Sequence, residues 1–128
     1  MAPESSGIYD WETMPAQAKA DKSPNESLDR LAVLRPAYLQ RLEARQAAVA
    51  QAARTAAGPG LSDTELADIH RTVHSMASSA AIYGYPALSD AARAAERVLE
   101  DGEGGNENRA STLTRVADEA YSVLLASR

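Results

Sequence analysis

Two histidines, His70 and His74, stand four residues apart in the stretch "IHRTVHSMASSAAIYGYPALSDAARAAE". In a helix this spacing brings both imidazoles to neighbouring positions, one turn apart on the same surface. An imidazole can act as a nucleophile, a general base or a metal ligand. The residues around and after His74 are small and leave room for another macromolecule to approach the ring: Ser75, Ala77, Ser78, Ser79, Ala80 and Ala81. The pattern indicates a histidine that reacts with a group brought by a partner.

The surrounding apolar residues predict which way each histidine points. A helix capped by Ser62 or Asp63 and ended by Gly84 carries apolar residues at alternating spacings of three and four: Leu66, Ile69, Val73, Met76, Ala80 and Tyr83. At about 100° per residue, His74 lies roughly 130° from the core direction and His70 roughly 90° from it. We therefore expect His74 to be exposed, with a surrounding face formed by Ala67, His70, Arg71, Ala77, Ser78 and Ala81.

Two other kinds of site use the same residue types. A histidine pair at this spacing can bind zinc, but "HRTVH" lacks the glutamate of the metalloprotease motif. With no cysteine and no third histidine, any further ligands would have to be carboxylates, and the sequence predicts no metal site. A serine hydrolase would need a base, an orienting carboxylate and an oxyanion hole in a cleft, which a smooth helical surface does not offer.

Four apolar stripes predict the helices that must position this site. Besides the histidine helix, one stripe runs from Pro36 to "GPG" at 58–60, one from Pro86 to "DGEGG", and one from about Asn108 to the C-terminus. A short helix from Ser27 is expected to end or bend at Arg35, before Pro36. Short links force neighbouring helices antiparallel, so the predicted fold is an all-α, antiparallel up-and-down four-helix bundle with a short extra N-terminal helix.

Composition sets the domain organisation and limits the partners. Residues 1–26 contain three of the six prolines and no sustained period, so we expect a flexible extension there and a bundle over 27–128. A net charge of -5, without a basic run, argues against nucleic acid. No signal-peptide pattern and no long apolar run is present, which argues against a membrane span and predicts a cytoplasmic protein.

The string around His74 resembles the histidine-containing phosphotransfer (HPt) domain of two-component phosphorelays. The hallmark of that family is a helix carrying "HSLKGSAGxxG", followed by "xxxLxxxAxxLE" on the next helix. The matching positions follow one another without a gap: His74, Ser75, Ser79, Ala80, Gly84, Leu88, Ala92 and Glu96. Met76 and Tyr83 stand where similar apolar residues are usual. The strong similarity covers about 30 residues, and the predicted bundle extends it.

The resemblance implies a role for His74. It would be the phosphoacceptor of a phosphorelay, exchanging a phosphoryl group with aspartates in response-regulator receiver domains; a hybrid histidine kinase is a further candidate partner. Ala67, His70, Arg71, Ser75, Ala77, Ser78 and Ala81 would border the partner or the phosphate. The sequence has no Walker motif and no glycine-rich loop after a strand, so we expect no ATP site. No cofactor of its own is expected, because the receiver domain supplies Mg²⁺.

The sequence departs from the family pattern close to the histidine. The usual Lys and Gly, three and four residues after the histidine, are replaced by Ala77 and Ser78. Arg71 lies one turn before His74 and can supply a cation, and the Ser78 hydroxyl can donate to phosphate. Two functions therefore stay open: a phosphorelay intermediate, or an HPt-like module that docks on receiver domains or kinases without carrying phosphate.

Overall fold

The computed structural model describes residues 24–128, with side chains described from residue 29 onward. The chain divides into two units between Pro36 and Ala37, and the site lies in the second, residues 37–128. Most of the predicted N-terminal extension, including "GIYDW", lies outside the described residues. Residues 24–26, which the sequence assigns to that extension, already belong to a helix.

Helix α2 spans Pro24–Ala57 and contains Pro36 in its interior. The sequence predicts that a separate short helix ends or bends at Arg35; no helix ends there, because α2 continues through Pro36. Proline fixes φ near the helical value, so its cost in a helix is a clash and one missing backbone hydrogen bond rather than a forbidden conformation. From Ala37 onward α2 belongs to the second unit.

Helices α3 (Asp63–Tyr83) and α4 (Pro86–Asp101) begin and end at the residues that the sequence predicts. Ser62 caps α3 in a capping box, in which its hydroxyl accepts from the Glu65 backbone N–H and the Glu65 carboxylate accepts from the Ser62 N–H. Gly84 ends α3 in the left-handed conformation, with φ of 85°, which glycine adopts without strain. One further residue then leads to Pro86 at the start of α4.

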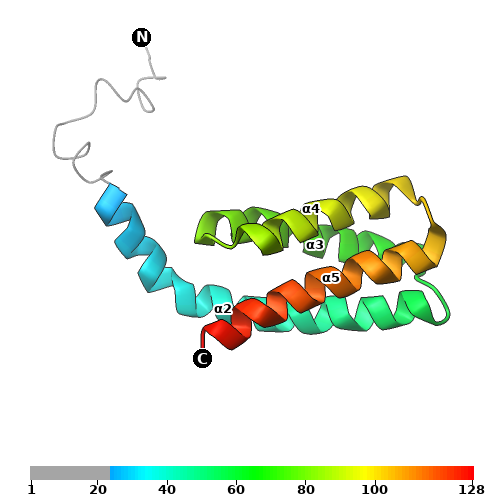
Figure 1. Ribbon diagram of the computed structural model, residues 1–128, viewed down its shortest axis with the longest axis horizontal. Helices are drawn as coiled ribbons and strands as arrows, with labels where there is room; N and C mark the ends of the chain where they lie inside the picture. The colour runs from blue at the N-terminus through cyan, green and yellow to red at the C-terminus, as the bar shows by residue number, and fades with distance from the viewer. Residues whose placement is uncertain (1–23) are drawn as a thin grey trace, which may run out of the picture. The chain divides into compact units, whose positions relative to one another are not determined.

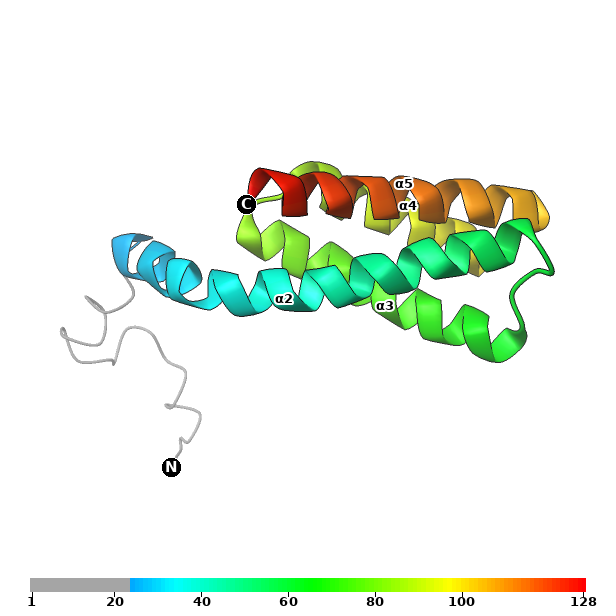
Figure 2. The same ribbon diagram turned by 90° about the horizontal axis from the view of Figure 1, so that it is seen from below.

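Helix α5 spans Gly105–Ala126 and begins three residues before the expected start at Asn108. Figures 1 and 2 show that the part of α2 in the second unit, α3, α4 and α5 run up and down in alternation, as expected for an antiparallel four-helix bundle. The described residues contain helices and no strand. None of the described helices is both long enough and apolar enough to cross a bilayer.

The core lies along the axis of this bundle and is built from small and aliphatic side chains. Every one of the four stripes contributes fully buried residues, among them Leu42, Val49, Val73, Leu88, Leu113 and Val116. Alanines fill the spaces between them, including Ala80, Ala92 and Ala120, which have no exposed surface. Small residues let the helices approach closely, and this close packing fixes the rotation of α3 about its own axis. The face of α3 opposite the core is consequently defined.

Candidate functional site

His74 lies near the middle of α3, on the face turned away from the core. Its side chain is 67% exposed, whereas the preceding residue, Val73, is fully buried. Nδ1 of the imidazole lies 2.6 Å from Oε2 of Glu96, a residue of α4 that is itself only 18% exposed. The ring is therefore accessible from solvent and is held on one side by a carboxylate from the neighbouring helix.

This contact determines how the neutral ring is protonated. A carboxylate can only accept a hydrogen bond, so Nδ1 of His74 must carry the proton that Glu96 accepts. In the neutral imidazole the lone pair is then on Nε2. His74 consequently presents Nε2 as its nucleophilic atom, with the carboxylate of Glu96 placed to stabilise positive charge that develops on the ring.

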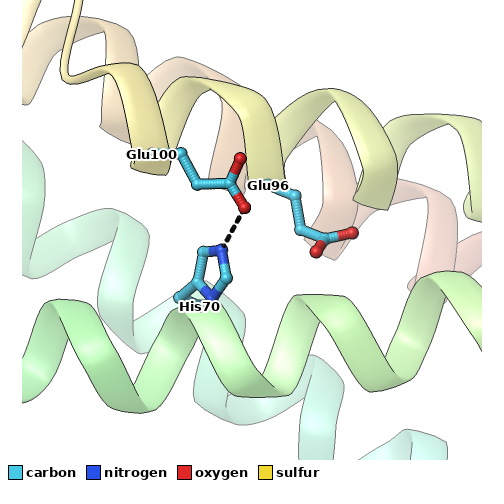
Figure 3. A group of neighbouring side chains, drawn as sticks. All are labelled: His70, Glu96 and Glu100. Carbon is cyan, nitrogen blue, oxygen red and sulfur yellow. Dashed lines mark hydrogen bonds and ion pairs between the residues drawn. The ribbon is translucent and has the colours of Figure 1, made fainter.

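His70 lies one turn before His74 and makes a second contact of the same kind. Its Nε2 atom is 2.8 Å from Oε2 of Glu100, and the two side chains are 32% and 55% exposed. Figure 3 shows His70 rising from α3 toward Glu96 and Glu100, which both descend from α4. His70 is thus less exposed than His74, in the order that the helical period predicts.

The face around His74 contains most of the small residues expected there. Five of the predicted border residues are exposed: Ala67, Arg71, Ser75, Ser78 and Ala81. Ala77 differs, because it is only 3% exposed and belongs to the core. Helix α4 packs over it, and the hydroxyl of buried Ser89 donates to the Ala77 carbonyl at 2.9 Å. The side chain of Ala77 is therefore not available to a partner, which corrects its assignment to the docking face.

Two arginine side chains lie on the side of His74 that faces α2. Arg71 is exposed and forms an ion pair with Asp68, so part of its charge is already neutralised. Arg45 of α2 lies beside the same turns of α3, where its Nη1 donates to the Ser79 hydroxyl at 3.5 Å. A shallow hollow between the two helices is lined by Arg45, Asp68, Arg71, Thr72 and Ser75. The site is thus acidic on the α4 side and basic on the α2 side.

Three residues of this arrangement were not identified by sequence reasoning as partners of the histidines. Glu96 was matched only as a family position, and Glu100 and Arg45 were not singled out. One signal was available for the glutamates: Glu96 and Glu100 repeat the four-residue spacing of the two histidines on the next, antiparallel helix. No comparable signal marks Arg45, because its approach to Ser79 depends on how α2 packs.

No curated protein and no solved structure matches the chain significantly. The sequence model of the Hpt domain, however, matches residues 33–126, which is more than half of the chain and includes all of α3 and α4. The chain therefore belongs to the Hpt domain family.

Proposed function

We propose that this protein is a phosphorelay intermediate that accepts a phosphoryl group on His74 and passes it on. Membership of the Hpt domain family supports a role connected with phosphorelays. The observation that supports phosphate transfer through His74 itself is the environment of this side chain. The imidazole is two-thirds exposed, and its Nδ1 atom is hydrogen-bonded to Glu96. A nucleophile held in this way needs access and orientation more than activation.

The transfer step is a reversible substitution at phosphorus. Nε2 of His74 forms the N–P bond while the P–O bond to the aspartate of a receiver domain breaks, and the aspartate leaves as a carboxylate. The ring then holds positive charge, which the Glu96 carboxylate stabilises through the Nδ1 proton. In the reverse direction a second receiver aspartate takes the phosphoryl group. The receiver's Mg²⁺ neutralises the phosphoryl oxygens during both steps.

The proposed docking surface is the exposed face of α3 around His74. It consists of His74 with Ala67, His70, Arg71, Ser75, Ser78 and Ala81. The short side chains of this surface do not extend past the imidazole ring, so the active site of a receiver domain can reach Nε2. Arg71 is a candidate to bind the transferred phosphoryl group in place of the usual lysine. To do so it must leave its ion pair with Asp68. This pair is exposed, and exposed ion pairs contribute only about 0–1 kcal/mol to stability.

The test is phosphoryl transfer to the full chain from a panel of isotopically labelled, phosphorylated receiver domains. We expect label on the chain as phosphohistidine, which is labile in acid and stable in base. The His74→Gln variant should take up none, whereas His70→Gln should be labelled more slowly, because His70 only borders the acceptor. Label that survives in His74→Gln and disappears in His70→Gln would contradict the assignment of the phosphoacceptor.

A second candidate function is docking without phosphate transfer. The observations that favour it are the absence of lysine at position 77 and the pairing of Arg71 with Asp68, which leave the site with less free positive charge. This function predicts that receiver domains bind the chain in calorimetry, that binding weakens in Ala81→Arg, and that no receiver domain labels the chain. Stable labelling of His74 would exclude it.

A further inference from the structure

A group of metal-binding side chains lies beside the phosphoacceptor, in the groove between α3 and α4. His70, Glu96 and Glu100 each offer one donor atom, and these atoms all lie within 4.8 Å of one another. Figure 3 shows His70 in contact with Glu100, with the Glu96 carboxylate beside this pair in the space between α3 and α4. The group differs from an ordinary surface ion pair because one imidazole faces two carboxylates rather than one.

The spacing of the donors suits a small divalent ion. Zinc binds imidazole nitrogen and carboxylate oxygen at about 2.0–2.2 Å, so the donors of a tetrahedral site lie about 3.4 Å apart. Here Nε2 of His70 and Oε2 of Glu100 are 2.8 Å apart, and no two donor atoms of the group are more than 4.8 Å apart. The required distance lies between these two values. Because His70 and Glu100 are partly exposed, changes in side-chain torsion can adjust the donors without moving the helices.

The helix register supports the same conclusion. Glu96 and Glu100 are one turn apart on α4 and face the two histidines, one turn apart on α3, across an antiparallel helix pair. Ligands on two packed helices are held by a rigid frame, which reduces the entropy lost on binding. Glu96 also accepts from Nδ1 of His74, and such hydrogen bonds orient a carboxylate for a metal.

The donor set indicates which ions are suitable. One imidazole with two carboxylates favours zinc and neighbouring transition ions over Mg²⁺ and Ca²⁺, which prefer oxygen ligands alone. The two carboxylates supply negative charge, which a divalent cation would neutralise. The chain has no cysteine, and its second histidine is His74.

We propose that His70, Glu96 and Glu100 form a binding site for one Zn²⁺ ion per chain. The ion would bind the same carboxylate that holds His74 and would therefore lie next to the phosphoacceptor. If the proposed phosphorelay function holds, occupancy of this site links transfer to the availability of zinc. The binding itself does not depend on phosphotransfer and is measured without it.

The test is a zinc titration of the full chain, without a histidine tag, in competition with a chromophoric chelator. We expect one equivalent to bind, with the affinity lowered at least tenfold in His70→Gln and in Glu100→Gln. Glu103→Gln, an exposed glutamate in the link after α4, is the matched control and should bind as the parent does. Circular dichroism of each variant checks that the helices are intact.

A second measurement distinguishes binding at this site from nonspecific attraction of metal cations to the acidic surface of the protein. Co²⁺ added to the full chain should give the visible absorption of a nitrogen- and oxygen-ligated ion, and the imidazole NMR signals of His70 should broaden. Either equal affinity in the parent, His70→Gln and Glu100→Gln, or the absence of a cobalt spectrum, would overturn the proposal. Neither result would bear on whether His74 accepts phosphate, because the titrations contain no phosphodonor.

Discussion

Removing the carboxylate beside His74 should slow phosphoryl transfer without disturbing the bundle. Two substitutions separate the two effects of Glu96. Glu96→Gln keeps a carbonyl that can accept from Nδ1 and so keeps the ring in place, but it removes the negative charge. Glu96→Ala removes the hydrogen bond and the charge together. We therefore expect transfer rates in the order parent, Glu96→Gln, Glu96→Ala.

The size of the effect follows from the geometry of the contact. Nδ1 of His74 and Oε2 of Glu96 are 2.6 Å apart, a short hydrogen bond to a charged group. Such bonds contribute about 1.5–3 kcal/mol when shielded from water. Because the histidine is 67% exposed, screening reduces this contribution, and we expect Glu96→Ala to cost about 1–2 kcal/mol in the transition state, or about 5- to 30-fold in rate. Glu96→Gln should lose a smaller part of this.

The assay is a single-turnover transfer from a labelled receiver domain, in buffer freed of transition metals and supplied with Mg²⁺. Nitrogen-15 NMR of the imidazole should show Nδ1 protonated in the parent and in Glu96→Gln, and a mixture of tautomers in Glu96→Ala. Glu103→Ala is the control for general loss of surface charge. An unchanged rate in Glu96→Ala, with an unchanged tautomer, would refute the assignment of Glu96 as the residue that positions His74.

The remaining predictions concern docking and stability. Ala81→Arg should block transfer and leave the helix content unchanged, because this exposed residue borders His74. Ser111→Arg, at an exposed position on α5, is the control and should have no effect. Equal transfer by both variants would place the docking surface elsewhere. Ser62→Ala should lower the free energy of unfolding by about 1 kcal/mol through loss of the helix cap, which urea denaturation measures; no change would mean that the capping box contributes nothing. Ser89→Ala should lower the free energy of unfolding by about 1 kcal/mol, because it removes a buried hydrogen bond from α4 to α3; an equal or more stable variant would contradict that reasoning.

Local sequence determined the helices and the exposed position of His74. Ser62, Gly84 and Pro86 are local signals for where a helix begins or ends, so α3 and α4 could be bounded without a tertiary structure. The period of the apolar residues fixed which face of α3 is buried, and from it the exposure of His74 followed. The expected helix end before Pro36 was wrong, because proline disfavours a helix without forbidding it.

Only the tertiary structure decided what surrounds the imidazoles. Glu96 and Glu100 approach His74 and His70 from residues 22 and 30 positions later in the chain, and these distances depend on the register between α3 and α4. Ala77 has the same spacing from His74 as a surface neighbour would, yet α4 packs over it. The helical period gives the direction in which the buried face of α3 points. It does not give the width of that face, which depends on how closely the neighbouring helices pack beside it. Side-chain packing between the helices sets that extent, and with it the partners of each histidine.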